Sequence, residues 1–224
     1  AVLQIFKKKS LLLLFLQGFL GVFPWNVITY WIFSYMEQER FFTEGDQMMA
    51  MVPAVLVMAA GYFVGGSIGD RLFQKNPRGR IYVAMFGVLA GAIMLFLSIM
   101  VPVENKILFM VLLSAAALFM PFAAPNVIST VYDITVPEVR STSLAIQYFI
   151  ESSGAALAPW LAGLIADAYD FKTAILGICV TAWVLGGIVL GITALKLPKD
   201  VQDLRDEMQA RADHEKELQE GSAA

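Results

Sequence analysis

The sequence is poor in the residues that build disulfides, metal centres and histidine-dependent active sites. Cys179 is its single cysteine, so no internal disulfide and no multi-cysteine metal site can form. His214 is its single histidine and lies in a polar C-terminal segment, which excludes a serine–histidine dyad within the apolar part of the chain. We therefore expect no metal and no cofactor, and we expect that the protein is not an enzyme.

Charge is scarce as well. Only 16% of the 224 residues are charged, and 58% are hydrophobic. Soluble domains are typically about 25% charged and about 45–50% apolar, so the composition places the chain among membrane proteins, with the lipid bilayer as its surroundings. No cluster of basic residues interleaved with aromatic residues is present, so we do not expect nucleic acid as a partner.

Long apolar runs are abundant. A helix needs about 20 mostly apolar residues to cross a hydrocarbon core of about 30 Å. Six runs meet this requirement, at about 10–36, 47–69, 81–101, 107–132, 137–167 and 173–197. Residues 1–197 are thus predicted to form a six-helix transmembrane domain. Pro198 is predicted to end the last span, and residues 198–224 to form a polar cytoplasmic tail, as a solvated helix, a disordered segment or a partner-binding coiled coil.

The basic residues predict the orientation of the spans. If the N-terminus is inside, the outer loops hold only three lysines and arginines: Arg40, Lys106 and Lys172. Because cytoplasmic loops carry the excess of lysine and arginine, we expect both termini to be cytoplasmic, which requires an even number of crossings. The expected location is the cell (inner) membrane. Arg80, in the loop after the second span, is interpreted as one of the anchors that set this orientation.

Short segments of the first three spans recur in the last three. Asn-Val-Ile-Thr at 26–29 is echoed by Asn-Val-Ile-Ser at 126–129, and Gly-Ser-Ile-Gly-Asp at 66–70 by Gly-Leu-Ile-Ala-Asp at 163–167. Arg40 follows the first echoed segment and Arg140 follows its copy, in the same order along the chain. An odd number of crossings separates the copies, so they would run in opposite directions through the bilayer. Unless the matches are coincidental, they predict a 3+3 inverted repeat, as in many secondary transporters.

One loop segment resembles a known family motif. The segment at 66–75 resembles the loop motif of the major facilitator superfamily: Gly, three residues, Asp, a basic residue, one residue, Gly and two basic residues. The matching positions are Gly66, Asp70, Arg71 and Lys75. Phe73 and Gln74 depart from the pattern. The segment at 137–142, followed by a helix rich in small residues with Pro159, is similar to the start of the family's eleventh helix.

The resemblance covers nearly all of the chain except the tail, and it is to the family's C-terminal half, helices seven to twelve. It implies an all-α, six-helix membrane bundle, one half of the general substrate transporter fold. The implied function is transport of a small solute by alternating access, as a secondary active transporter or a facilitator. The N-terminal six-helix half would then belong to the same longer chain or to a partner subunit. The alternative is a non-transporting membrane sensor or assembly subunit.

Four charged residues are candidates for a conformational gate. Asp70 and Arg71 lie where the second span leaves the membrane on the inside, at the start of a basic loop over 70–80. Asp133 and Arg140 flank the next inner loop, between the fourth and fifth spans. Charges paired across the inner rim can hold one conformation shut and release it when they separate. The alternative for such charges is simple anchoring at the membrane surface.

Glu151 is the ionisable residue deepest in a span, about ten residues from the start of the fifth. Such residues are functional candidates by default. Gln147 lies one turn earlier on the same helix face. Glu151 could carry a coupling proton or bind a cationic group of the solute, and the alternative is a protonated glutamate that is hydrogen-bonded within the bundle.

Amides and hydroxyls on other spans complete the candidate binding set. Asn26 and Tyr30 lie on the first span and Asn126 on the fourth. In the resembled family these two helices line the central path, so the resemblance implies contact with the solute, whereas hydrogen bonding between helices is the alternative. Gln17 and Trp25 are weaker candidates on other faces. The scarcity of charge at depth favours an uncharged, amphipathic, lipid-like or singly charged solute.

Overall fold

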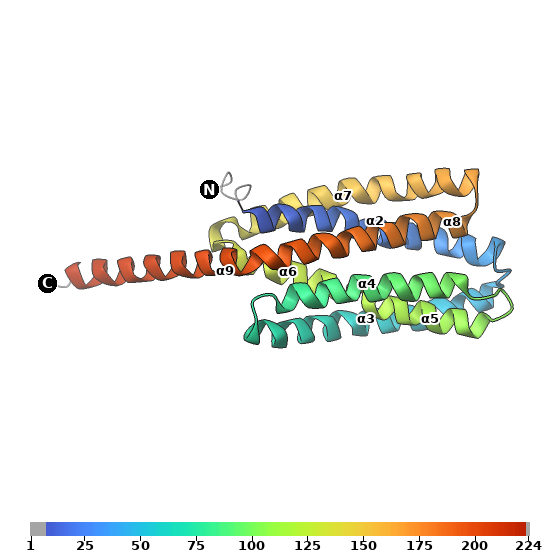
Figure 1. Cartoon of the computed structure of the whole chain (residues 1–224), viewed down its shortest axis with the longest axis horizontal. Helices are drawn as coiled ribbons and strands as arrows, with labels where there is room; N and C mark the ends of the chain where they lie inside the picture. Colours follow the sequence, from blue (N-terminus) through green and yellow to red (C-terminus); the bar gives the residue numbers. More distant parts are fainter. Residues whose placement is uncertain (1–7, 223–224) are drawn as a thin grey trace.

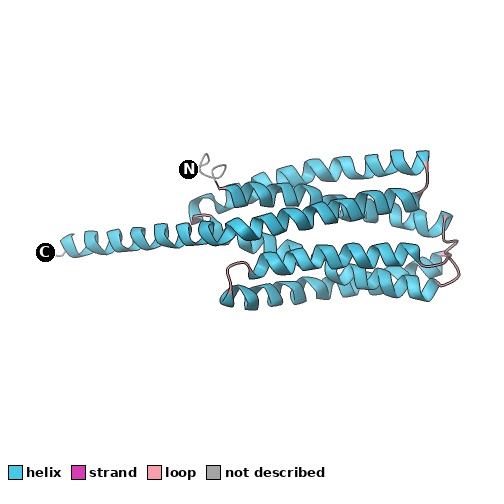
Figure 2. Cartoon of the chain, viewed as in Figure 1, coloured by secondary structure: helices cyan, strands magenta, loops and turns pink. Residues whose placement is uncertain are grey.

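The computed structural model describes residues 8–222, with the backbone alone for 215–217 and 220–222. Residues 1–7 and 223–224, which the predicted domain and tail include, lie outside the described residues. Every element of secondary structure in the described part of the chain is a helix (Figure 2). The elements, in chain order, are α2 (Lys9–Gln38), α3 (Glu44–Lys75), α4 (Gly79–Met100), α5 (Lys106–Phe119), η1 (Met120–Phe122), α6 (Ala123–Ile134), α7 (Pro137–Ala168), α8 (Phe171–Ile175), η2 (Leu176–Val180) and α9 (Thr181–Ser222).

These elements form six spans. Six helical stretches are long and apolar enough to cross a membrane, because α5, η1 and α6 run on as one stretch and so do α8, η2 and most of α9. Pro121 lies in the short η1 turn that separates α5 from α6. Proline cannot donate a backbone hydrogen bond, which explains a tightened turn at this point. The predicted number of spans and the all-α class are confirmed.

Pro198, which was predicted to end the last span, does not end the last helix. Helix α9 continues through Pro198 to Ser222 and projects beyond the bundle (Figure 1). Val201 and Leu204 remain buried after the proline, so packing holds this part of the helix in place. Further along, Arg211 forms an ion pair with Glu207 one turn earlier, a spacing that supports an exposed helix. The predicted boundary between domain and tail thus lies inside a continuous helix.

The helices pack in two groups that join along α4 and α9. Helix α2 packs mainly against α7 and α9, whereas α5 and α6 pack mainly against α3 and α4. Contacts between α4 and α9 join the two groups. Helix α2 begins and α9 leaves the bundle at the same end, which also holds the α3–α4 and α6–α7 turns (Figure 1). We call this the inner end and the opposite one the outer end.

Glycines bring α3 unusually close to the fourth span. A Cβ atom at Gly61 would lie 2.3 Å from the carbonyl oxygen of Leu118, and one at Gly65 would lie 2.8 Å from the Cα of Phe122. Lipid tails give helices no hydrophobic reason to associate, so small residues that allow backbone contact hold membrane bundles together. This contact fixes α3 against the end of α5 and the η1 turn of the fourth span.

Candidate functional site

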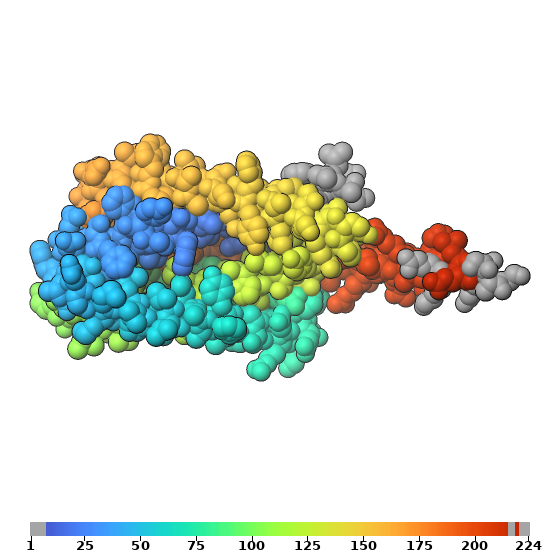
Figure 3. All heavy atoms as spheres, turned by 180° about the vertical axis from the view of Figure 1, so that it is seen from behind, coloured from blue at the N-terminus to red at the C-terminus, as the bar shows by residue number. Residues whose placement is uncertain are grey.

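A cavity of about 250 Å³ opens between α2, α3, α6 and α7. We call it the central cavity. Figure 3 shows it as a hollow between α2 and α3. Most of its wall is apolar. Its polar and aromatic lining residues are Gln17, Trp25, Tyr62, Gln147, Tyr148, Glu151 and Trp183.

Glu151 and Gln147 form the polar end of the central cavity. Both are on α7, one turn apart, and the Gln147 amide Nε2 donates a hydrogen bond of 2.8 Å to Glu151 Oε1. Across the cavity wall, a Cβ atom at Gly18 would lie 2.6 Å from that same Oε1. A side chain at this position of α2 would therefore require the carboxylate to shift. The carboxylate is held beside the α2 backbone by its partner on α7 and by the space at Gly18.

Of the six predicted binding residues, three line the central cavity: Gln17, Gln147 and Glu151. Asn26 and Tyr30 do not line it. The Asn26 amide donates to the carbonyl of Val22 within its own helix, and the Tyr30 side chain is 65% exposed on the outer surface of α2. The physical reason is helical phase, since a residue one position off the lining face is rotated by about 100°.

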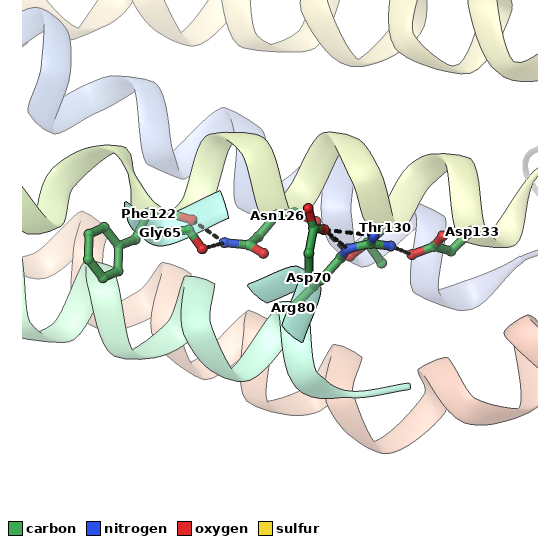
Figure 4. A network of polar contacts seen from close by, with 7 residues as sticks. All are labelled: Gly65, Asp70, Arg80, Phe122, Asn126, Thr130 and Asp133. Atoms are coloured by element: carbon green, nitrogen blue, oxygen red, sulfur yellow. Dashed lines mark hydrogen bonds and ion pairs between the residues drawn. The ribbon is translucent and has the colours of Figure 1, made fainter. Parts of the chain in front are cut away.

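Asn126 is buried at the contact between α3 and α6, outside the central cavity. Its amide nitrogen donates to the carbonyl oxygens of Gly65, at 3.0 Å, and Phe122, at 2.8 Å (Figure 4). Only 1% of its surface is exposed. In this conformation Asn126 links two helices, which is the alternative that the sequence left open for it.

Sequence reasoning missed most of the aromatic lining. Tyr62, Tyr148 and Trp183 face the cavity from three different helices. Trp25, a weaker candidate in the sequence, does line the cavity, eight residues after Gln17 on α2. For Tyr62 and Trp183 the sequence carries no signal, since only the packing of distant spans brings them to one site.

Three charged side chains meet at the inner end, one from each of α3, α4 and α6. Arg80 donates to Asp70 Oδ1 through Nη2 at 2.8 Å and through Nε at 3.0 Å, and Nη1 pairs with Asp133 (Figure 4). The guanidinium also stacks over the Phe73 ring, 4.1 Å from its centroid. We call Asp70, Arg80 and Asp133 the inner network. The arginine fork suits this role because it can serve two carboxylates at once.

The predicted gate residues are only partly brought together. Asp70 and Asp133 share Arg80, which the sequence interpretation had treated as an orientation anchor alone. Asp70 lies within the last turns of α3, so the predicted loop over 70–80 is helical as far as Lys75. Arg71 is exposed. Arg140 donates to the backbone carbonyls of Tyr132 and Thr135, which are the groups that a helix C-terminus leaves unpaired.

A buried arginine lies at the outer end. Arg40, just after α2, donates to the backbone carbonyls of Val101 at 3.0 Å and Pro102 at 3.1 Å. Its guanidinium lies 4.2 Å from the centroid of the Phe109 ring, and only 2% of the residue is exposed. Arg40 therefore joins the end of the first span to the turn between α4 and α5.

The side chains of the central cavity are suited to binding a solute. Within the described part of the chain, no group of three histidine, cysteine, aspartate or glutamate side chains is placed to hold a metal ion. The central cavity presents a carboxylate, two amides and several aromatic rings. Such groups bind a small molecule by hydrogen bonds, charge and stacking.

A sequence model described as the Major Facilitator Superfamily matches residues 1–159. Among solved structures, the chain is similar to one titled "Selectivity mechanism of a bacterial homologue of the human drug peptide transporters PepT1 and PepT2". The TM-score is 0.63 at 17% sequence identity, over 91% of this chain and 52% of that chain. The present chain thus spans about half the length of that structure. The comparison with curated proteins finds no match.

These findings agree with the resemblance that the loop segment at 66–75 had indicated. The sequence match covers more than half of the chain, and the six-helix fold is shared with a transporter structure. Family and fold point to a transporter rather than to an enzyme. The chain is an integral membrane protein that belongs to the Major Facilitator Superfamily.

Proposed function

We propose that the chain supplies the C-terminal six-helix bundle of a transporter that moves a small solute across the membrane by alternating access. One observation carries the proposal: in a chain of this family, a cavity is lined by residues of all six spans and holds a carboxylate far from either end of its helix. Sites of this kind near the bilayer midplane are where such transporters bind their solutes. Gln17, Gln147 and Glu151 are the proposed solute contacts.

The packing supports the proposed 3+3 inverted repeat. The first span packs on the fifth and sixth, and the fourth packs on the second and third. If the first three spans correspond to the last three, exchanging the two triplets turns one set of partners into the other. Arg40 and Arg140, which the sequence echo pairs, both donate to backbone carbonyls at the ends of spans. We infer that two copies of one three-helix unit form the bundle.

We propose that the inner network takes part in gating. Arg80 joins Asp70 of the second span to Asp133 of the fourth, so it links the two halves of the repeat at one rim. Arg71 and Arg140 lie on the same rim, where Arg140 steadies the end of α6. Asp70, Arg71, Asp133 and Arg140 remain the proposed gating set, with Arg80 as its centre. Separation of these charges would release the inner end.

The proposed topology places the inner end in the cytoplasm of a cell with an inner membrane. The start of α2 and the departure of α9 share that end with Arg71, Lys75, Arg78 and Arg80, as the positive-inside rule requires. The proposed partner is the N-terminal six-helix half, on the same longer chain or on a separate subunit. It would cover the open side of the central cavity.

Flux into liposomes tests the transport function. The full chain is reconstituted alone and together with the complementary six-helix half, and uptake of a labelled sugar, dipeptide and organic amine is followed. We expect saturable uptake of at least one of these solutes when both halves are present. Folded protein that gives no saturable uptake of any of them, with or without the second half, would contradict the proposal.

Two substitutions test the proposed roles within a working transporter. Asp70→Lys places a like charge beside Arg80, so we expect it to slow turnover more than it weakens solute binding. The opposite pattern would argue against gating.

Glu151→Gln removes an ionisable group, and we expect it to alter the pH profile of uptake if Glu151 carries a coupling proton. An unchanged profile would exclude that role.

The projecting part of α9 favours a second candidate, a membrane sensor or assembly subunit with this helix as its output. From Arg205 to His214 the helix is exposed, and Arg211 ties it back through an ion pair with Glu138 at 2.8 Å. Removal of residues 212–224 distinguishes the two functions. A transporter would keep its uptake, whereas a sensor or assembly subunit would lose the binding of its partner.

A further inference from the structure

A second cavity adjoins the central cavity. It has a volume of about 200 Å³ and lies toward the outer end, between α2, α3 and the fourth span. Met51, Met58 and Met120 line it together with aliphatic and aromatic side chains, and we call it the methionine pocket. Trp25, Met58 and Met120 line both cavities, so the two are neighbours with a shared wall. Methionine side chains are flexible and polarisable, and they adapt to apolar groups of varied shape.

The polar end of the central cavity holds an acceptor without a donor. Gln147 is 2% exposed, and its Oε1 has no hydrogen-bond partner, because the Nε2 of the same amide is the atom that serves Glu151. Buried polar atoms are nearly always paired, so an unpaired one on a residue that lines the cavity is a candidate acceptor for a ligand donor. The Glu151 carboxylate, one turn away, is a second acceptor.

The same wall has little to offer an anion. Among the described residues that line the two cavities, none is a lysine or an arginine. A solute with a carboxylate or phosphate would bring a negative charge toward Glu151 without a compensating cation. A free amino acid or peptide carries such a carboxylate, so the lining disfavours it. A group that carries N–H donors and a positive charge would satisfy both Gln147 and Glu151.

We propose that the solute is a protonated primary amine with a bulky apolar body. Its ammonium group donates to Gln147 Oε1 and to the Glu151 carboxylate, and its hydrocarbon part occupies the methionine pocket. Trp25 lies where the two parts join, with its ring available to both. This proposal rests on the proposed function, since it takes the central cavity as the transport site and names the class of solute that fits it.

Binding of four related probes to the full chain in lipid nanodiscs tests the proposal. They are 1-adamantylamine, 1-adamantanol, adamantane-1-carboxylate and methylammonium, measured at pH 7 by calorimetry and by tryptophan fluorescence, which Trp25 would report. The first three share one apolar cage and differ in charge, and the fourth keeps the charge without the cage. We expect the adamantyl amine to bind about tenfold or more tightly than each of the others. Equal binding of the amine and the alcohol would overturn the proposal.

Two variants separate the two parts of the site. Glu151→Gln should weaken binding of the adamantyl amine about tenfold and leave that of adamantanol unchanged. Ala117→Leu narrows the methionine pocket, which Ala117 lines. It should weaken the binding of the adamantyl amine and of adamantanol alike. Glu104→Gln removes an exposed carboxylate from the outer turn and is the matched control, with no expected effect. If Glu151→Gln weakens the amine and the alcohol equally, Glu151 has a structural role and the proposal fails.

The failure of this proposal can be told from the failure of the transport function. Selective binding of the amine without flux would uphold the amine site and contradict transport. Saturable flux of a sugar or dipeptide, with no preference for the amine in the binding assay, would uphold transport and overturn the amine site.

Discussion

Each end of the bundle holds an arginine, buried at the outer end and half-buried at the inner end, and the two arginines differ in what they bind. At the outer end, Arg40 donates to the backbone carbonyls of one turn and is 2% exposed. At the inner end, Arg80 pairs with the side chains of Asp70 and Asp133, which come from two different spans. Asp70 is mostly exposed, with 59% of its side chain accessible.

This difference indicates which end is built to move. Backbone carbonyls in a turn are fixed by the chain itself, so the Arg40 contacts break only if the turn unfolds. Carboxylates on separate helices can rotate away, and water can replace the arginine at the exposed partner. Hydrogen bonds to a buried charged group are also stronger than ion pairs at the surface. We therefore expect the outer end to be a fixed joint and the inner network to be a releasable one.

The largest expected effect is that of Arg40→Met on stability. The change leaves the Val101 and Pro102 carbonyls without their donor, and two hydrogen bonds to a charged group together account for about 3 kcal/mol. Unfolding can be followed by dye labelling of Cys179, the single cysteine, which is buried. The control is Arg71→Met, at an exposed arginine, with an expected change below about 0.5 kcal/mol. Similar losses in the two variants would show that the outer arginine is no fixed joint.

Arg80→Gln should have a smaller effect on stability and a larger one on transport. It leaves two carboxylates without a cation, but Asp70 can hydrate, so we expect a loss of about 1–2 kcal/mol. Uptake rates should change more than solute affinity does. Arg80→Lys keeps the charge without the fork and should recover only part of the rate. If Arg80→Gln lost as much stability as Arg40→Met and left transport unchanged, the two ends would not differ in the way we expect.

The two carboxylates of the inner network should also differ from each other. Asp133 is 21% exposed and Asp70 is 59% exposed. Asp133→Asn removes the more buried partner, so we expect a loss of about 1 kcal/mol, against less than about 0.5 kcal/mol for Asp70→Asn. The Cys179 labelling assay measures both. The reverse order would mean that exposure does not govern the strength of these pairs.

Salt should give the smallest effect. At 1 M salt the screening length falls to about 3 Å, so exposed pairs weaken and buried contacts do not. We expect the stability difference between the parent chain and Asp70→Asn to vanish at 1 M salt. The difference for Arg40→Met should remain. Equal salt sensitivity of the two would indicate that both arginines are open to solvent.

The spans and one polar pair of the central cavity follow from local sequence alone. Long apolar runs predict six crossings because lipid offers backbone groups no partner outside a helix. Glu151 and Gln147 were predicted to act together because one helical turn separates them, and their hydrogen bond has that origin. The loop segment at 66–75 likewise indicates the family from the sequence alone.

The departures have a common cause in packing between distant segments. From the sequence, Arg80 is interpreted as a residue that sets the orientation of the spans. Only the packing of α3, α4 and α6 makes it the centre of the inner network. Asn126 matches Asn26 in sequence, yet Asn126 donates to a carbonyl of α3, whereas Asn26 donates to a carbonyl of its own helix. Pro198 predicts a helix end, but burial of Val201 and Leu204 outweighs the single hydrogen bond that proline removes.

The sequence by itself determined what lipid demands: apolar helices of sufficient length, few charges at depth, and basic residues toward one side. Each of these is a local requirement, since every span must satisfy its own backbone and cover its own length of hydrocarbon. Only the tertiary structure decided which polar groups share a cavity, which charges pair, and which helix face is buried. Those outcomes depend on the rotation of each helix against its neighbours, which side-chain packing fixes and no single segment encodes.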